Sequence, residues 1–174
     1  MISVIMDAFK KILICAIVLL LLWGGKTLFF PPSENEKIER MLHQAAEDFA
    51  AKKLKSVSLL LSDDFSSLPK GDKEMAEMQM KAFFFQVRDL SASIEYLKHE
   101  NEKLPSVATE ARVLAVVKVS GTIDGARFQA FGSHGADAVV LTLRKQNEEW
   151  RVFRARYLDT KDPMTAFREL VNGN

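Results

Sequence analysis

An apolar segment near the N-terminus constrains this chain more than any other feature. Residues 12–25 contain no charged side chain, and after Lys26 the apolar character continues to Phe30. Spanning the hydrocarbon core of a bilayer takes about 20 residues, so 12–30 is just long enough if the Lys26 ammonium reaches the interface. We therefore expect residues 1–30 to form a transmembrane anchor and residues 31–174 to form one separate domain.

The charges next to this segment predict its orientation. Lys10 and Lys11 precede it, and basic residues favour the cytoplasmic side. We expect a single-pass protein of a bacterial inner membrane, with its C-terminal domain in the periplasm or outside. A cleaved signal peptide is the alternative, but residues 23–26 (Trp-Gly-Gly-Lys) do not resemble the small-residue site at which such peptides are cut.

Charge and cysteine content exclude several classes of function. The 24 basic and 23 acidic side chains give a net charge of +1, whereas nucleic-acid binding needs a basic excess. Cys15, inside the apolar segment, is the only cysteine. The chain therefore cannot form an internal disulfide or a thiolate-ligated metal site.

The first part of the domain is predicted to be helical. Ser33 and Glu36 form a capping box after two prolines, and a helix should follow to about Lys53. Its apolar face consists of Ile38, Met41, Leu42, Ala45 and Phe49. A short helix is expected over 54–61, closed by residues 62–65. After a turn at 68–71, Asp72 should cap a third helix reaching Asp89. The apolar side of that helix is predicted to comprise Met75, Met78, Ala82, Phe83 and Val87.

The second part alternates with a period of two, as strands do. Strands are expected over 93–98, 109–119, 128–131, 138–145 and 149–157, with turns at 121–125 and 146–148. Asp162 and Pro163 should begin a last helix, whose inward residues are Met164, Phe167, Leu170 and Val171. Helices followed by strands favour an α+β fold, with helices packed on a curved antiparallel sheet and a C-terminal helix.

Two stretches resemble a known superfamily. One is the helical segment 45–54 running into 59–65, and the other is the hairpin 140–152, in which Trp150 follows a tight turn. Both are similar to the nuclear-transport-factor-two-like superfamily, which includes ketosteroid isomerase and scytalone dehydratase. The resemblance covers about 36–157 and implies a cone-shaped domain. Because the superfamily contains enzymes, ligand binders and assembly modules, it does not decide the function.

No residue pattern predicts catalysis, a metal site or a cofactor. Enolate chemistry needs a carboxylate and a proton donor in one pocket, but Glu95 and Tyr96 are adjacent on a strand and should face opposite ways. Glu110 is expected to face solvent. His43, His99 and His134 lack ligand-like spacing, although His43 is predicted to touch the rim of a pocket beside the apolar helix face.

Arginines gather on the last hairpin at 144, 151, 154 and 156. Trp150, Val152, Arg154 and Arg156 have the same parity and should share one face of the strand. Guanidinium groups at the mouth of a cone would suit a carboxylate or phosphate. The candidate ligand-binding residues are therefore Arg154, Arg156, Trp150 and His43. The alternative is a solvated sheet face paired with Glu148 and Glu149, or a protein contact.

Three functions remain open. The first is a non-catalytic interaction or assembly module, which would use the open sheet face or the Met/Phe-rich helix against another membrane protein or a second copy. The second is a binder or sensor of a small apolar or anionic ligand in the cone. The third is an isomerase- or hydratase-like enzyme. An exposed apolar patch would favour the first function, and an apolar cavity the second.

Overall fold

The computed structural model describes residues 31–68, 71–130, 138–158 and 162–172. The chain divides into two compact units, Met1–Ser33 and Glu34–Asn174, and the second contains every helix and strand described. The predicted anchor at 1–30 lies outside the described residues. Within the described part of the chain, no helix is long and apolar enough to cross a membrane.

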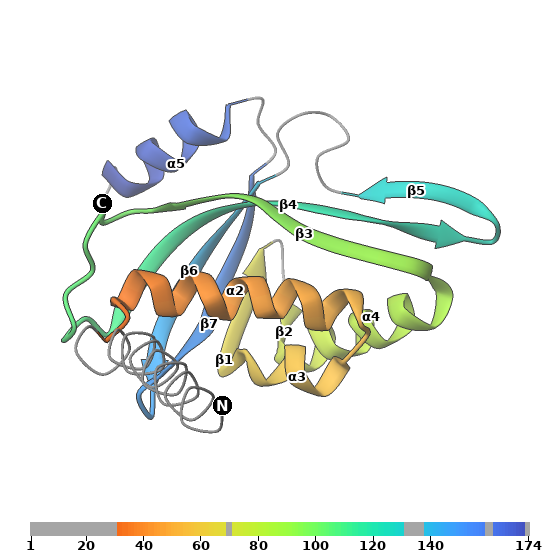
Figure 1. The fold of residues 1–174 in the computed structure, drawn as a ribbon, viewed down its shortest axis with the longest axis horizontal. Coiled ribbons are helices and arrows are strands. Elements are labelled where there is room, and N and C mark those ends of the chain that lie inside the picture. Colours follow the sequence, from red (N-terminus) through yellow and green to blue (C-terminus); the bar gives the residue numbers. More distant parts are fainter. Residues whose placement is uncertain (1–30, 69–70, 131–137, 159–161, 173–174) are drawn as a thin grey trace, which may run out of the picture. The chain divides into compact units, whose positions relative to one another are not determined.

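The second unit is built on one seven-stranded sheet in the order β2-β1-β7-β6-β4-β3, with β5 paired to β4 (Figure 1). The strands are β1 (Leu61–Leu68), β2 (Gly71–Asp72), β3 (Arg88–His99), β4 (Glu110–Ile123), β5 (Ala126–Ala130), β6 (Ala138–Gln146) and β7 (Glu149–Leu158). All pairs are antiparallel except β1 with β7.

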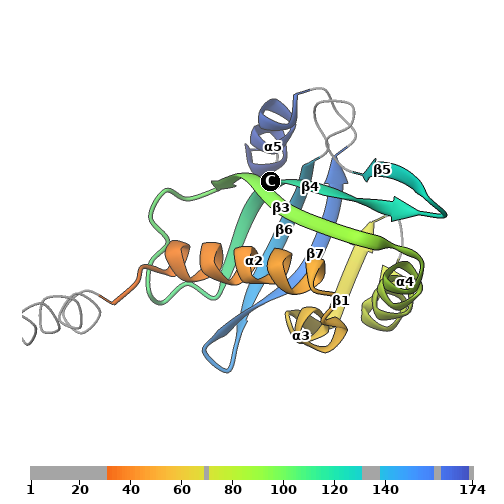
Figure 2. The same ribbon diagram turned by 45° about the vertical axis from the view of Figure 1, so that its right-hand side comes forward.

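The helices cover both faces of this sheet. They are α2 (Glu34–Ala50), α3 (Leu54–Leu59), α4 (Lys73–Gln86) and α5 (Pro163–Asn172). Helices α2 and α3 lie on one side of the sheet and α5 on the other (Figure 2). We call the side with α2 and α3 the inner face and the side with α5 the outer face. The predicted α+β fold, with helices on a curved antiparallel sheet, is confirmed.

Helix α2 packs with the predicted residues toward the inner face. Ile38 and Leu42 are buried among Phe65, Trp150 and Val152 in the larger core cluster. Side chains four residues apart lie above one another on a helix, so this spacing gives α2 a continuous apolar side.

The end of the second predicted helix is wrong. Helix α3 stops at Leu59, and β1 begins at Leu61, where a closing loop was expected. Leu61 pairs with Val152 and Ser66 with Arg154, so β1 forms beside β7. The hydrogen bonds that stabilise β1 come from a strand about 90 residues further along the chain. No local pattern in 61–68 can indicate this pairing.

Helix α4 has the predicted cap but only part of the predicted apolar side. Val87 is buried and Phe83 packs against Phe49, with ring centroids 5.9 Å apart, whereas Met75, Met78 and Ala82 are exposed. The Asp72 carboxylate accepts a hydrogen bond from the Met75 backbone N–H at 2.8 Å. Phe84 is the buried residue of the helix, and its ring centroid lies 4.9 Å from that of Phe49. Met78 is 65% and Phe85 93% exposed. The side of α4 that carries Met78 and Phe85 is therefore open to solvent.

One of the two predicted hairpin turns is shorter than expected, and the other is found as predicted. Strand β4 continues through Gly121, and the turn predicted at 121–125 is only Asp124–Gly125, with φ of 50° and 81°. A Cβ at Gly121 would lie 2.6 Å from Val87 Cγ1, at the end of α4. Only glycine therefore lets β4 pass this close to Val87. The predicted turn between β6 and β7 is confirmed at Asn147 and Glu148, with φ of 50° and 66°.

Helix α5 forms a second, smaller core on the outer face. Asp162 accepts hydrogen bonds from the Thr165 N–H and hydroxyl at 3.1 and 2.7 Å. Phe167 is buried against Leu114, Ala138, Val140 and Leu158. Met164, Leu170 and Val171 pack partly buried around this cluster, which confirms the predicted inward side of the last helix.

Candidate functional site

An apolar pocket of about 310 Å³, partly open to solvent, lies between the inner face and helices α2 and α3. We call it the apolar cavity. All 17 residues that line it are apolar. They are Leu42, Ala45, Ala46, Phe49, Val57, Leu60, Leu61, Phe65, Ala92, Ile94, Ala115, Val117, Val119, Val139, Leu141, Val152 and Ala155.

Small side chains explain why space remains here. Five of the lining residues are alanines, two from α2 and three from the sheet: Ala45, Ala46, Ala92, Ala115 and Ala155. Protein interiors otherwise pack at crystal-like density. Alanines from both layers therefore leave a volume that larger residues would fill.

The lining limits the chemistry that is possible in the cavity. General acid–base catalysis needs a titratable group within hydrogen-bond reach of the substrate, and no titratable side chain lines the cavity among the described residues. The volume lies at the low end of the range of small-molecule sites, about 300–1,000 Å³. The arrangement suits a small apolar molecule.

A β-bulge in β7 separates this cavity from the predicted arginines. Val152 pairs with Leu143 and Arg154 pairs with Thr142, so Phe153 is an extra residue without a partner on β6. Val152 and Ala155 line the inner cavity, whereas Arg154 and Arg156 line a groove on the outer face. The prediction that Trp150, Val152, Arg154 and Arg156 share one face is wrong, because the bulge reverses the alternation after Val152.

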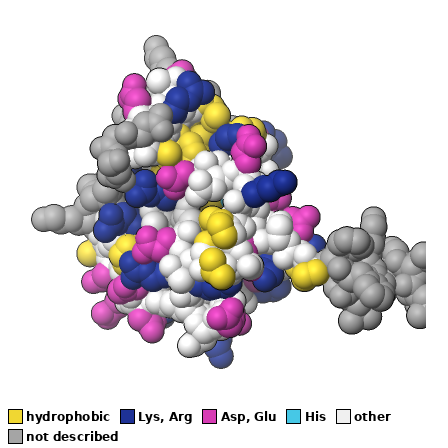
Figure 3. All heavy atoms as spheres, turned by 90° about the vertical axis from the view of Figure 1, so that its left-hand side faces the viewer, with side chains coloured by type: hydrophobic (Ala, Val, Ile, Leu, Met, Phe, Trp, Pro, Cys, Tyr) yellow, Lys and Arg dark blue, Asp and Glu magenta, His cyan; other side chains and the backbone are white. Residues whose placement is uncertain are grey.

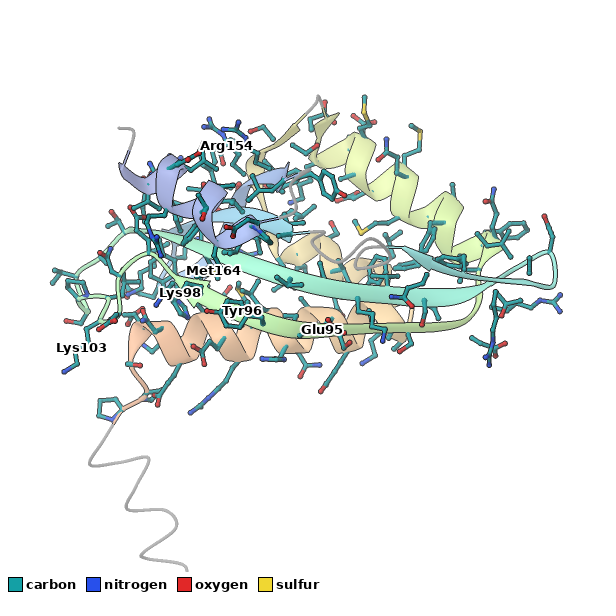
Figure 4. The ribbon with its side chains drawn as sticks, turned by 90° about the horizontal axis from the view of Figure 1, so that it is seen from above. Glu95, Tyr96, Lys98, Lys103, Arg154 and Met164 are labelled. Atoms are coloured by element: carbon teal, nitrogen blue, oxygen red, sulfur yellow. The ribbon has the colours of Figure 1, made fainter. Side chains whose placement is uncertain are left out.

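The outer groove has a volume of about 460 Å³ and lies between β4, β6, β7 and α5. Its polar lining consists of Arg112, Arg144, Arg154, Arg156, Glu110 and Thr142, and its apolar lining of Val140, Phe153, Phe167, Leu170 and Val171. Figure 4 shows Arg154 beside α5 when the outer face is viewed from above. We call this region the arginine groove.

The arginines of the groove differ in their partners. Arg144 donates to Glu110 at 2.9 Å and to Asp64 at 3.1 Å, and Arg112 lies 3.9 Å from Glu100. Arg154 and Arg156 are exposed, and no described carboxylate lies within 4.0 Å of either. The alternative of pairing with the hairpin acids therefore does not apply to these two: Glu149 pairs with Arg151 and Glu148 with Lys145.

Trp150 has a structural contact that the sequence did not indicate. Its indole N–H donates to Glu34 Oε2 at 2.7 Å. Glu34 is only 5% exposed and also contacts Lys37 at 2.7 Å and Lys145 at 3.2 Å. Burial by itself would raise the pKa of Glu34, but the hydrogen bonds from Lys37, Trp150 and Lys145 outweigh it and lower the pKa to about 2. This cluster joins the start of α2 to the β6–β7 hairpin.

The histidines do not come together. His43 is exposed on α2 and does not line the cavity, although its neighbour Leu42 does. His99 Nε2 lies 3.0 Å from Glu39 Oε1, and His134 is outside the described residues. Among the described residues, no group of three His, Cys, Asp or Glu side chains could hold a metal ion.

A second bulge affects the candidate acid and tyrosine on β3. The register shifts between Ile94 and Tyr96, and both Ile94 and Leu97 pack in the inner core. Glu95 and Tyr96 are exposed between them (Figure 4), and Glu95 lies 3.9 Å from Lys118. The prediction that these two side chains face opposite ways is wrong. Both lie outside the cavity.

Solved structures share this fold. No family model matches the sequence, and a search of curated proteins found no match. A candidate scytalone dehydratase from Novosphingobium aromaticivorans is 16% identical, with a TM-score of 0.61 over 73% of this chain and 84% of its own. A candidate aromatic ring hydroxylase from the same organism is 10% identical, with a TM-score of 0.58 over 70% and 85%.

A third similar structure belongs to a different kind of protein. It is a candidate calcium/calmodulin-dependent protein kinase II association domain from Xanthomonas campestris, 14% identical, with a TM-score of 0.57 over 74% and 90% of the two chains. At these identities the likeness concerns the fold alone, and it supports the cone-shaped domain expected from the sequence. The three proteins are two candidate enzymes and a candidate association domain, so the likeness does not select one function.

Proposed function

We propose that the domain is a non-catalytic binder of a small apolar molecule, held inside the cone between the sheet, α2 and α3. The apolar cavity is the observation that carries this proposal. Its lining offers about 310 Å³ without a polar side chain, and transfer of apolar surface out of water stabilises a complex by about 25 cal/mol per Å². An isomerase or hydratase would need an acid or base in the same space.

The proposal also includes the location of the domain at a membrane. The apolar segment 12–30 and the preceding Lys10 and Lys11 support a single-pass anchor that holds the domain outside the cytoplasm of a bacterial cell. Apolar molecules concentrate in bilayers, so an anchored binder would meet its ligand there.

The first test is ligand-dependent stabilisation of the full-length chain in amphipol, with naphthalene as the probe. A ligand that binds only the folded state raises the melting temperature. We expect naphthalene to raise the Tm of the wild type and of Ala82→Leu, a matched control on the exposed side of α4. Ala155→Leu adds the same atoms inside the cavity, and this variant should lose the shift.

Two results would contradict the proposal. One is a wild-type Tm that naphthalene leaves unchanged at its solubility limit. The other is an equal shift in the Ala155→Leu and Ala82→Leu variants, because binding would then occur away from the cavity.

An interaction module is a second candidate, supported by exposed apolar side chains on α3 and α4. Leu59, Met75, Met78 and Phe85 are exposed, and the Ser58 hydroxyl donates to Glu77 between these helices. Large exposed apolar surface marks protein contacts. Light scattering on the full-length chain should show an oligomer that becomes a monomer in the double variant Met78→Glu/Phe85→Glu. Equal masses for wild type and variant would rule this surface out.

A further inference from the structure

We propose that the arginine groove is a second binding site, which takes a single-chain amphiphile with an anionic head, a carboxylate or a phosphate. The head would lie on Arg154 and Arg156, and the chain would lie against α5. The site is separate from the apolar cavity and independent of the function proposed for it.

The sheet register places the polar groups of the groove in one row. Arg154 pairs with Thr142 on β6, and Thr142 pairs with Arg112 on β4. Neighbouring strands are about 4.8 Å apart, so the two arginine backbones are separated by about 10 Å with a hydroxyl between them. Arg156 follows two residues after Arg154 on the same face and also lines the groove. Side chains as long as arginine can converge on one head group over these distances.

The charges of the groove do not cancel. Glu110 is the one acidic residue among the described residues that line it, and it already contacts Arg144, which Asp64 also neutralises. Arg154 and Arg156 have no such partner in the described part of the chain. A guanidinium group binds carboxylates and phosphates in bidentate geometry, so the groove is complementary to an anion.

The remaining lining is apolar and lies next to these charges. Phe167, Leu170 and Val171 of α5 form one wall, and Phe153 contributes its ring. The Arg144 and Arg154 guanidinium carbons lie 3.9 and 5.3 Å from the centre of that ring, a cation–π arrangement that orients the guanidinium groups. In Figure 3, where α5 is at the top, hydrophobic side chains reach the surface between basic ones. An inorganic ion would contact only the charged residues of the groove, whereas an amphiphile would contact the charged and the apolar residues.

The experiment is isothermal titration of the full-length chain in amphipol with octyl phosphate below its micelle concentration. Inorganic phosphate and octanol serve as probes of the head and the chain alone. We expect octyl phosphate to bind the wild type, and each probe alone to bind at least about tenfold more weakly. Arg154→Ala/Arg156→Ala should lower the affinity about 100-fold, because two charge-assisted hydrogen bonds are lost.

Matched variants locate the site. Arg40→Ala/Arg127→Ala removes two exposed arginines away from the groove and should leave the affinity unchanged, as should Ala155→Leu inside the cavity. Equal losses in the two arginine double variants would overturn the proposal, and so would equal affinity for inorganic and octyl phosphate. Binding that disappears in Ala155→Leu would place the chain in the cavity and also overturn it.

Discussion

The inner and outer faces of the sheet differ in the way that each uses β7. On the inner face, Val152 and Ala155 border a cavity lined only by apolar side chains. On the outer face, Arg154 and Arg156 border a groove in which charges meet apolar residues of α5. Phe153 is the bulge residue between the two sets. Because the bulge takes Phe153 out of the ladder, Arg154 and Arg156 stay out of a space that could not stabilise them.

This difference follows from the cost of burying charge. A guanidinium group in an uncharged cavity would lose its hydration without gaining a partner, at a cost of several kcal/mol. Glu34 is a buried charge on the inner side, and it is tolerated because Trp150, Lys37 and Lys145 surround it. The cavity is thus suited to packing an apolar ligand, and the groove to pairing with an anionic one.

Ala155→Arg would break the comparison most severely. It places a guanidinium group on the inner face, in a cavity whose described lining is entirely apolar, at a cost of several kcal/mol. We expect the domain not to fold, with loss of the far-UV circular dichroism of the full-length chain. Deletion of Phe153 should retain the folded spectrum, because Val152 and Arg154 then alternate in a regular strand and both arginines still face outward. A folded spectrum for Ala155→Arg would show that the cavity tolerates a charge.

Truncation on the inner face of β7 should destabilise the domain far more than truncation on the outer face. Trp150→Ala removes a buried indole, and we expect the free energy of unfolding to fall by about 3–5 kcal/mol. Arg154→Ala, on the same strand but exposed, should change it by less than about 0.5 kcal/mol. Urea denaturation of the full-length chain measures both values. Similar midpoints for the two variants would mean that the faces are not energetically distinct.

Glu34 gives a dependence on pH that is specific to the inner side. Its pKa is about 2 in the folded chain, below the ordinary 4.5, so its stabilising contribution is complete above about pH 5. That contribution is lost as the pH falls toward 2. Glu34→Gln should lower the free energy of unfolding by about 1–3 kcal/mol at pH 7. The difference from the wild type should shrink below pH 4.5.

The matched control for this measurement is Glu47→Gln, an exposed residue on the same helix. It should leave the unfolding free energy unchanged across the range. A constant difference between wild type and Glu34→Gln from pH 7 to pH 2.5 would show that the carboxylate charge is not what stabilises the cluster.

Added salt should produce the smallest of these effects, a loss of ligand affinity on the outer face but not on the inner face. Raising the ionic strength from about 0.05 to 0.5 M screens exposed charges. We expect a several-fold loss of affinity for octyl phosphate in the groove and no loss for naphthalene in the cavity. Calorimetric titrations at both salt concentrations measure this. An equal response of the two ligands would mean that they share one site.

Local patterns in the sequence predict the elements of the domain well. The apolar spacing of Ile38 and Leu42, the Asp72 cap and the turn at Asn147 are all found in the structure. Each depends on residues a few positions apart, which explains the success. Strand β1 depends on β7, and its residues 62–67 carry no alternating apolar signal, so it could not be predicted.

The candidate site was harder to predict for the same reason. The parity of Trp150 and Arg154 is correct only in a strand without a bulge, and the bulge at Phe153 is defined by pairing with β6. The cavity arises from alanines on separate elements, such as Ala45 and Ala155, whose proximity exists only in the folded domain. The Glu34–Trp150 contact joins residues 116 positions apart. An acid in the first turn of a predicted helix and a tryptophan after a predicted turn are the sequence signals that could suggest such a pair.

Native mass spectrometry of the full-length chain purified from cells tests the central claim most directly. The apolar cavity predicts a small non-covalent mass that leaves on denaturation. This mass should persist in Arg154→Ala/Arg156→Ala and disappear in Ala155→Leu, which fills the cavity. A mass that disappears in the arginine variant and persists in Ala155→Leu would contradict the account, because the ligand would then occupy the outer face and leave the cavity without a function.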